Sequence, residues 1–415
     1  MNASLKAPRI QSVDALRGFA LAGVALVHML EQYTAGPVAE ALTQSLNQSI
    51  ADSIVQGLVG FLFIGKFFAL FSILFGLSFS IQMRSAERKG ERFAMRFLWR
   101  AILLFGIGYV HQLFYRGDIL TIYAVLVPFL IPVYPVKNKW ILLLAAIFLF
   151  SLPRMLIGPL LEVESLFNVP SFSEGEHPFN QAYSEAVQNG SILDVFAQNA
   201  NFGMRTKMAF QFSLFGRIFT TLGYFYFGLW LGKMDVFRKI EDWLPKTKKV
   251  LLWTLGFIVM GVITAFILFS FAQGAPDPET GARTPDFDSP FAFIGFNFFD
   301  WANIGLTLMI LTTFLFLYHR KIKWQSFFDF FAPYGRMALT NYILQSVIGT
   351  YLLFGWGLGL IGKLPAIALF GIALVLIVVQ SLFSRWWLSK FKYGPLEWLW
   401  RSLTYFKAQP FVREG

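Results

Sequence analysis

The sequence predicts an all-α polytopic membrane protein with about ten transmembrane helices, and three observations support this fold class. Hydrophobic residues make up 56% of the 415 positions and charged residues 14%, which is typical of multi-pass membrane proteins. Apolar stretches of bilayer length recur along the chain, because a helix needs roughly 20 residues to cross about 30 Å of hydrocarbon. The basic residues lie between these stretches, so we interpret the net charge of +11 as a topology signal. We therefore predict the lipid bilayer, and not nucleic acid, as a partner.

Ten spans fit this pattern, at residues 13–32, 58–82, 97–115, 119–134, 140–158, 208–232, 250–272, 291–318, 337–359 and 365–388. If the N-terminus is cytoplasmic, the segments on that side contain 26 Lys and Arg residues and those on the other side contain five. Because Lys and Arg are retained inside, both termini are predicted to be cytoplasmic. A signal peptide is the alternative for the first stretch, but Asp14 and Arg17 at its start favour a retained span.

The sequence also excludes several kinds of site. There are no cysteines, so disulfides, thiolate metal sites and cysteine nucleophiles are excluded. No P-loop, nucleophile elbow or zinc motif occurs, and we predict no metal. Gly228 with Gly232, and Gly355 with Gly359, have the spacing of close helix contacts rather than of nucleotide loops. No internal repeat or long linker divides residues 1–415, which we expect to form a single membrane domain.

The first span carries a polar stripe that is unusual for a lipid-facing helix. At 100° per residue, Arg17 and His28 lie within about 20° of each other, and Asp14 lies one turn before Arg17. An ionisable side chain at the centre of a membrane helix costs on the order of 2.5–3.5 kcal/mol. The stripe therefore predicts a protein-lined, hydrated cavity with this helix as one wall.

The third span repeats the pattern. Arg96, Arg100 and His111 share one helix face, and the helix ends in a tight turn that contains Asp118. His28 and His111 each lie about fifteen residues from the cytoplasmic end of their spans. We therefore expect the two histidines at similar depth, in the outer half of the membrane.

Further spans contribute polar residues: Lys66 in the second, Arg217 in the sixth, Asp300 in the eighth, and Arg336, Asn341 and Gln345 at the start of the ninth. The cytoplasmic arginines suit phosphate groups, whereas the outer histidines and aspartates suit proton transfer. Two plainer interpretations stay open. Buried polar pairs can be structural contacts between helices, and cytoplasmic arginines can serve topology alone.

Five motifs resemble the YeiB-like family of bacterial membrane proteins (domain of unknown function 418). They are VDALRG (13–18), KFFALFSILFG (66–76), GYVHQLFYRGDILTIYA (108–124), GRMALTNYILQS (335–346) and GPLEWLWRSLT (394–404). The positions that match the family's motifs are Asp14, Arg17, Gly18, Lys66, His111, Asp118, Tyr123, Arg336, Asn341, Gln345 and Glu397. The resemblance covers nearly the whole chain and implies a place in the bacterial cytoplasmic (inner) membrane.

That family is distantly similar to the transmembrane acyltransferases of the acyltransferase-3 and heparan-glucosaminide acetyltransferase types. The similarity implies transfer of an acyl group from cytoplasmic acyl-CoA, such as acetyl-CoA, to an extracytoplasmic hydroxyl or amine of a small-molecule or glycan acceptor. The first-span pattern of acyltransferase-3 proteins is matched by Asp14, Leu16, Arg17, Gly18 and His28. Their Arg-x-x-Arg pair is not matched, because Arg92, Arg96 and Arg100 are spaced by four. The resemblance implies an acyltransferase-like half at 1–206 and a YeiB-type half at 207–400.

Three sets of residues carry the predicted chemistry. The acyl-CoA donor is expected to contact Arg17, Arg96, Arg100 and Arg336. The general base and its orienting carboxylate are expected among His111, His28, Asp118 and Asp300. The rest of the cavity is expected to include Asp14, Lys66, Tyr123, Arg217, Asn341 and Gln345. Two alternatives remain: a small-molecule transporter or exporter with a proton relay in the same cavity, and a non-catalytic scaffold. A homo-oligomer is compatible with each of these.

Overall fold

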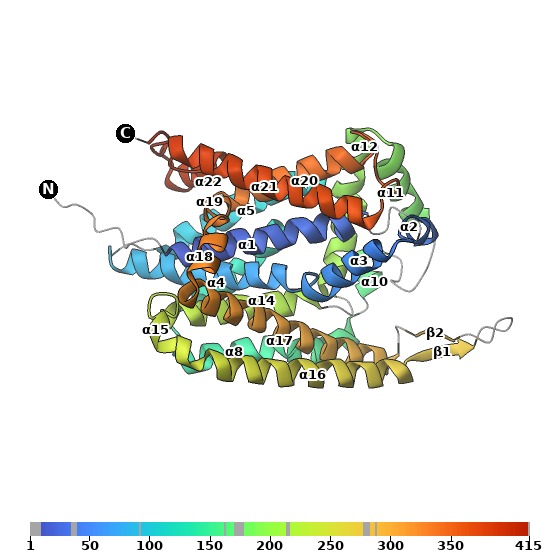
Figure 1. The fold of residues 1–415 in the computed structure, drawn as a ribbon, viewed down its shortest axis with the longest axis horizontal. Helices are drawn as coiled ribbons and strands as arrows, with labels where there is room; N and C mark the ends of the chain where they lie inside the picture. Colours follow the sequence, from blue (N-terminus) through green and yellow to red (C-terminus); the bar gives the residue numbers. More distant parts are fainter. Residues whose placement is uncertain are drawn as a thin grey trace.

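The computed structural model describes residues 10–34, 40–90, 93–161, 163–169, 178–212, 216–276, 283–286 and 289–413. Within these ranges the chain is a bundle of helices with one two-stranded antiparallel ribbon, in which Gln273 pairs with Pro285 and Pro276 with Arg283 (Figure 1). The all-α prediction is therefore confirmed.

The first half of the chain contains three long helices joined by shorter elements. These are α1 (Gln11–Val27), the π-helical turn η1 (His28–Gln32), α2 (Glu40–Leu46), α3 (Ile50–Leu62), α4 (Phe67–Glu87), α5 (Phe93–Phe114), α6 (Leu120–Leu126), η2 (Val127–Phe129), α7 (Leu130–Val133), α8 (Asn138–Leu149), α9 (Leu152–Ile157), η3 (Gly158–Leu160), α10 (Val163–Phe167), α11 (Pro178–Asn189), α12 (Ile192–Gln198), η4 (Asn199–Gly203) and α13 (Met204–Phe212).

The second half contains the longest helix and the C-terminal group. Its elements are α14 (Arg217–Lys233), α15 (Ile240–Trp243), η5 (Leu244–Lys246), α16 (Thr247–Phe271), β1 (Gln273–Pro276), β2 (Arg283–Pro285), α17 (Pro290–Arg320), α18 (Ile322–Asp329), α19 (Ala332–Arg336), α20 (Ala338–Leu353), α21 (Ala366–Lys390) and α22 (Pro395–Tyr405).

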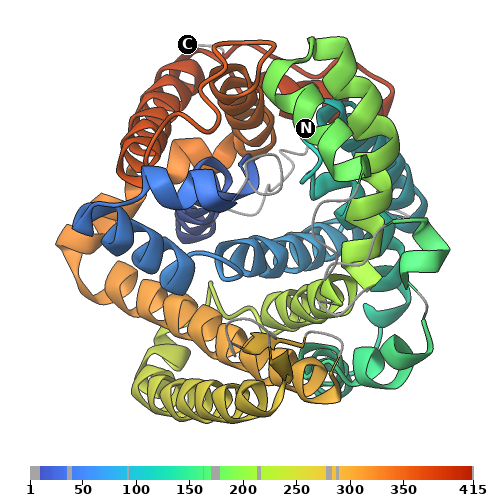
Figure 2. The ribbon, with the colours of Figure 1, turned by 90° about the vertical axis from the view of Figure 1, so that its right-hand side faces the viewer.

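The bundle has two distinct ends. The start of α1 and the whole of α22 lie at one end, which we call the terminal end, and α2, α11, α12 and the ribbon lie at the other, the distal end (Figure 1). Figure 2, viewed from the distal end, shows α16 and α17 at one edge, α21 at the opposite edge, and α1, α4 and α14 between them. α1 and α4 are thus central, which fits the predicted role of the first span as a cavity wall.

Six helices in the described ranges are long and apolar enough to cross a bilayer. They cover Gln11–Glu31, Ile50–Glu87, Ala94–Phe114, Ile240–Phe271, Pro290–Arg320 and Ala366–Lys390, each within or overlapping a predicted span. The protein is therefore a multi-pass membrane protein. The other four predicted spans contain shorter helices, so the count of ten and the side of the termini stay predictions.

Backbone breaks explain the shorter helices. Ser151 adopts a left-handed φ of 60° between α8 and α9, and Gly216 (φ 48°) precedes α14. Pro128 interrupts the fourth predicted span, because proline removes a helical hydrogen bond. Gly355 and Gly359 lie in the turn after α20 and not within a helix, but a Cβ at Gly355 would collide with the backbone of Gln188 in α11, so the close contact predicted at this glycine is present. Hydropathy averages do not register such single-residue breaks.

Glycines bring together the helices that line the candidate site. A Cβ at Gly18 of α1 would collide with the backbone carbonyl of Phe331, and one at Gly335 of α19 would collide with α1. This close crossing explains why a glycine follows Arg17 and precedes Arg336, since it brings both arginines to the same cavity. Gly228 of α14 meets the α4 backbone in the same way, as its spacing predicts.

Candidate functional site

Two buried histidines from different helices meet in the distal half of the bundle. His28 opens η1, and His111 lies near the end of α5. Both rings contact Tyr115 and Tyr342, with centroid distances of 5.1 and 5.8 Å for His28 and 6.2 and 4.9 Å for His111. The wide π-helical turn places Tyr33 beside His28 as well, at 5.6 Å. The structure thus gathers the two predicted histidines into one aromatic pocket.

Asp118 holds one of these imidazoles in a defined orientation. Its Oδ1 lies 2.7 Å from Nδ1 of His111 and accepts a hydrogen bond from the Leu120 N–H at 3.1 Å. Its Oδ2 accepts from the N–H and the hydroxyl of Thr121, both at 2.9 Å, and lies 3.8 Å from Nζ of Lys207. Burial alone would raise the pKa of Asp118, but the contacts with His111, Lys207 and Thr121 outweigh it, and the pKa is lowered.

The consequence is a defined tautomer for His111. An ionised Asp118 accepts the proton on Nδ1, which leaves Nε2 as the acceptor nitrogen. Nε2 is buried and has no hydrogen-bond partner among the described residues, and the same holds for Nδ1 of His28. His111 therefore has the arrangement of a general base whose second nitrogen is fixed by a carboxylate.

Local sequence explains why Asp118 is so well fixed. Asp118 lies in the turn before α6 and bonds the first free N–H groups of that helix, which is the ordinary behaviour of aspartate at a helix start. Lys207 reaches the same turn from α13 and donates to Gln112 and, at 2.6 Å, to the hydroxyl of Thr121. Burial lowers the pKa of Lys207 to about 8.

A cavity of about 240 Å³ leads from the terminal end towards these histidines. Arg17, Arg100 and Arg336 line it near the terminal end, and Leu120 and Tyr342 line its inner end. The lining between them is mainly apolar and includes Phe71, Leu74, Phe75, Phe97, Ala101, Leu104 and Val127. The ring of Tyr342, whose hydroxyl accepts from a backbone N–H of the α5–α6 turn at 3.2 Å, stands between the cavity and His111.

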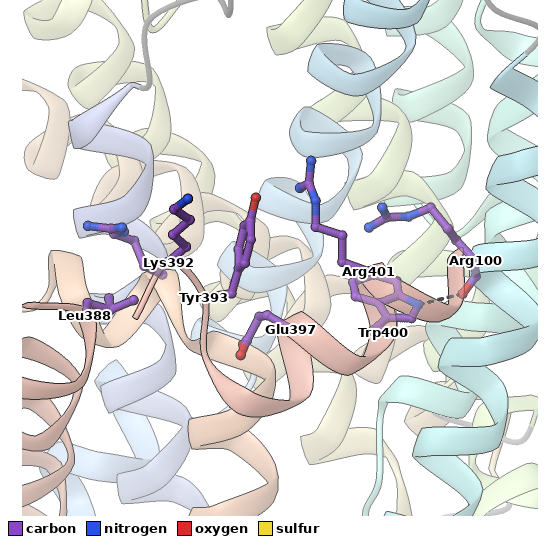
Figure 3. Close-up of a pocket in the computed structure, with 8 residues that line it drawn as sticks. Arg100, Leu388, Lys392, Tyr393, Glu397, Trp400 and Arg401 are labelled. Carbon is purple, nitrogen blue, oxygen red and sulfur yellow. Dashed lines mark hydrogen bonds between the residues drawn. The ribbon is translucent and has the colours of Figure 1, made fainter. Parts of the chain in front are cut away.

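A second cavity, of about 180 Å³, forms the mouth of the first (Figure 3). The two share Arg100, Arg336, Glu397 and Trp400, and the mouth also includes Leu388, Lys392, Tyr393 and Arg401. Four cations thus surround a single carboxylate at the terminal end. Figure 3 shows Arg100 beside the indole of Trp400, and Arg401 next to Trp400 on the same helix. This mouth is suited to a ligand with several negative charges.

The carboxylate in this mouth, that of Glu397, accepts hydrogen bonds from the protein itself. Oε1 of Glu397 accepts from the N–H groups of Leu339 and Thr340 at 2.7 and 3.1 Å, and Oε2 lies 2.6 Å from the Thr340 hydroxyl. Burial raises the pKa of Glu397, and these hydrogen bonds offset part of the rise. Glu397 therefore anchors the start of α20.

The four arginines predicted to hold a donor separate into three that line the cavities and one that does not. Arg17 pairs with Asp14 at 3.1 Å, and its Nη2 donates to Ser78 at 2.9 Å. The guanidinium of Arg100 lies 4.2 Å from the ring centre of Trp400. Arg96 instead lies over Tyr405 at 5.1 Å and lines neither cavity.

The remaining predicted residues fall in three places. Tyr123 lines the cavity, and its hydroxyl lies 2.6 Å from the Ser72 hydroxyl. Asn341 donates to the Tyr334 carbonyl at 3.1 Å, and Gln345 Oε1 lies 3.1 Å from the Tyr334 hydroxyl. These two amides connect α20 to α19 away from both cavities, which fits the plainer interpretation of structural contacts. Asp300, Lys66 and Arg217 form a separate cluster, in which Asp300 contacts arginines and not a histidine.

Sequence reasoning missed several residues of the site. They are Lys207, Tyr342 and Tyr115 around the histidines, and Lys392, Tyr393, Trp400 and Arg401 in the mouth. Lys207 and Arg401 lie outside the ten predicted spans, and spacing along the chain carries no information on which helices are neighbours. Trp400 lies three residues from Glu397, a motif position, and that proximity was the available signal.

Comparisons with known proteins give a family but no activity. The family described as "Protein of unknown function (DUF418)" matches residues 231–407. The uncharacterized protein YxaH of Bacillus subtilis (strain 168) is 31% identical over 330 residues, which is 76% of this chain and 72% of that protein. An uncharacterized 39.9 kDa protein of Bacillus acidopullulyticus is 25% identical over 314 residues, 75% of this chain and 72% of that protein. The uncharacterized protein YeiB of Escherichia coli (strain K12) is 44% identical over 78 residues, 19% of this chain and 20% of that protein. No solved structure matches the chain.

Proposed function

The chain belongs to the YeiB-like DUF418 family, and from this premise we propose that it is a membrane acyltransferase. It would move an acyl group, acetyl in the simplest case, from cytoplasmic acyl-CoA to a hydroxyl or amine acceptor across the membrane. One observation carries the proposal: a cationic mouth, an apolar cavity and a buried imidazole–carboxylate pair follow one another along α5.

The donor site follows from charge and polarity. Phosphate groups of the donor bind in the mouth to Arg100, Arg336 and Arg401, because guanidinium groups match phosphate oxygens in charge and geometry. The uncharged arm and the thioester lie in the apolar cavity. Arg100 and His111 are eleven residues apart on α5, which corresponds to about 16 Å along the helix. The uncharged arm of the donor would have to span this distance. The Tyr342 ring turns aside to admit the thioester to His111.

The chemistry then needs only one base. The acceptor's oxygen or nitrogen forms a bond to the thioester carbonyl carbon while its proton passes to Nε2 of His111. The carbon–sulfur bond breaks, and the departing thiolate takes that proton. Asp118 stays ionised throughout and stabilises the imidazolium that forms between the two proton transfers, as the carboxylate of a hydrolase triad does.

Orientation is the second part of the proposal. The terminal end carries the mouth, and the excess of Lys and Arg in the segments predicted on that side, 26 against five, supports a cytoplasmic orientation for it. Acyl-CoA is a cytoplasmic metabolite, so mouth and donor are on the same side of the inner membrane. The histidines then lie in the outer half, within reach of an extracytoplasmic acceptor.

Binding of acetyl-CoA to the purified protein in detergent, measured by calorimetry, tests this proposal. Arg100→Ala removes charge-assisted hydrogen bonds worth about 1.5–3 kcal/mol, so we expect binding to weaken roughly 10- to 150-fold. Arg96→Ala is the matched control, one turn away on the same helix, and leaves binding unchanged. His111→Ala retains binding and loses acyl transfer.

Absence of acetyl-CoA binding, or equal losses in Arg96→Ala and Arg100→Ala, would refute the donor site. The alternative of a small-molecule transporter then takes precedence, and substrate-uptake measurements in vesicles follow.

A further inference from the structure

A second buried charged cluster lies in the distal half and shares no residue with the two cavities. Arg154 of α9 donates from Nη1 to Oδ2 of Asp300 on α17 at 3.0 Å. Arg217, the first residue of α14, lies 3.7 Å from Oδ1 of the same carboxylate. Lys66, just before α4, is close enough for its charge to act on Arg217 and Asp300. Each of these residues lies within a predicted span, where an ionisable group is expensive.

The charges in this cluster do not balance. Three cations surround one carboxylate, which leaves a net charge of about +2 in a site where Arg154 is fully buried and Lys66 is 3% exposed. The structure holds Arg154 closely, since a Cβ at Gly216 would collide with its side chain. Unbalanced buried charge is strongly unfavourable, so a counter-charge is needed for the site to be stable.

Several hydrogen-bond donors in the cluster also lack an acceptor. Nε and Nη2 of Arg154 are buried with no hydrogen-bond partner among the described residues. Arg217 touches Asp300 beyond hydrogen-bond length, and Lys66 makes one long contact, 3.4 Å, to the carbonyl of Gly60. α14 begins at Arg217 without a side-chain cap, so its positive end adds to the same field.

We propose that Lys66, Arg154 and Arg217 form a binding site for a phosphate group in the distal half of the membrane domain. A phosphate oxyanion supplies both missing elements, because it carries one or two negative charges and several acceptor oxygens. The way in is by Arg217, whose side chain is 21% exposed, whereas that of Asp300 is 9% exposed and that of Arg154 is fully buried. The phosphate belongs either to a phospholipid headgroup or to a soluble ligand.

Thermal unfolding of the purified protein in detergent tests the site with inorganic phosphate as the probe, at constant ionic strength set with chloride. Phosphate should raise the unfolding midpoint by roughly 2–4 °C, because a ligand that binds the folded state stabilises it. Lys66→Met removes one of the repelling cations. It should raise the midpoint without phosphate and abolish the phosphate-dependent rise. Arg320→Gln is the control, since Arg320 makes an exposed pair with Glu241 at 3.3 Å.

Two further measurements complete the test. Arg217→Gln removes the accessible cation while leaving the buried pair intact, so it guards against a folding defect and should also lose the phosphate response. The same scan in nanodiscs of phosphatidylglycerol and of phosphatidylcholine separates the sources, because a headgroup phosphodiester would stabilise the protein without added phosphate. A phosphate response that persists in both variants, or no response to phosphate or to phosphatidylglycerol, overturns the proposal. Neither Lys66→Met nor Arg217→Gln should change the binding of acetyl-CoA. The proposed phosphate site and the proposed donor site can therefore be refuted separately.

Discussion

The contact between Asp118 and Lys207 predicts a measurable coupling energy. Asp118→Asn preserves shape but removes the charge, and it places an amide N–H where one carboxylate oxygen stood. Either Oδ1 or Oδ2 is lost as an acceptor, and each accepts two hydrogen bonds. With about 1.5–3 kcal/mol for each charge-assisted bond, the expected loss of stability is about 3–6 kcal/mol.

The coupling to Lys207 is worked from distance. At 3.8 Å and an effective dielectric constant of about 20, the attraction is about 4 kcal/mol, and breaking one partner of a buried pair costs about 3–5 kcal/mol. Each single variant leaves the other charge buried and unpaired. The double variant Asp118→Asn/Lys207→Met removes both charges, so it should cost at least about 2 kcal/mol less than the sum of the singles.

Thermal unfolding of the four proteins in one detergent gives this cycle. A matched cycle on Asp235 and Arg84, which pair at 3.1 Å with a quarter of each side chain exposed, should give a coupling of about 0–1 kcal/mol. Additive effects at Asp118 and Lys207 would refute the buried ion pair. In the proposed reaction, Asp118→Asn also lowers the transfer rate by about 10²- to 10⁴-fold with acetyl-CoA binding retained.

Three further outcomes are expected. Gly228→Leu, at the α4 crossing, should lower stability by at least about 1–3 kcal/mol through overpacking, while Gly256→Leu, which has nothing within 4 Å, should change it by less than about 0.5 kcal/mol in the same unfolding assay. The pKa of Lys207 is about 8 in the folded protein against an ordinary 10.5, so the unfolded chain binds more protons between these values. Stability should therefore gain from a rise in pH from 8 to 10, and the gain should be absent in Lys207→Met; equal pH profiles would contradict this. Trp400→Ala, which removes the ring under Arg100, should weaken acetyl-CoA binding about two- to five-fold by calorimetry, and no change would show that the stacking is not used.

Much of the fold is readable from hydropathy because a bilayer imposes a length on each helix. The six long spans follow from that constraint. The turns at Ser151 and Gly216 do not, because left-handed residues interrupt a helix without changing its average hydropathy. In the sequence, Gly18 and Gly335 are only positions within motifs. Their role, to let the backbones of α1 and α19 cross closely, is visible only in the structure.

The sequence indicated which residues are candidates for the site, but it did not indicate which of them contact each other. Helical spacing identified His28 and His111 as polar positions at one depth, since a helix rises uniformly per residue. Spacing did not distinguish Asp118 from Asp300 as the carboxylate, because both are reachable from His111 if the order of helices is unknown. The 2.7 Å contact to Asp118 identifies the partner, and Lys207, which balances its charge, lies on the short helix α13, just before the predicted span at 208–232.

The three charged regions differ in one physical respect that separates their roles. At the histidines, Lys207 balances the charge of Asp118, and Nε2 of His111 is buried without a hydrogen-bond partner among the described residues. In the mouth, four cations line a cavity that also contains the carboxylate of Glu397. At Arg154, positive charge is in excess and the guanidinium is fully buried. Neither a second carboxylate nor screening by water offsets this excess charge. A balanced buried site suits proton transfer, whereas an unbalanced one requires a bound anion, and this difference is why we assign base chemistry to the first and phosphate binding to the last.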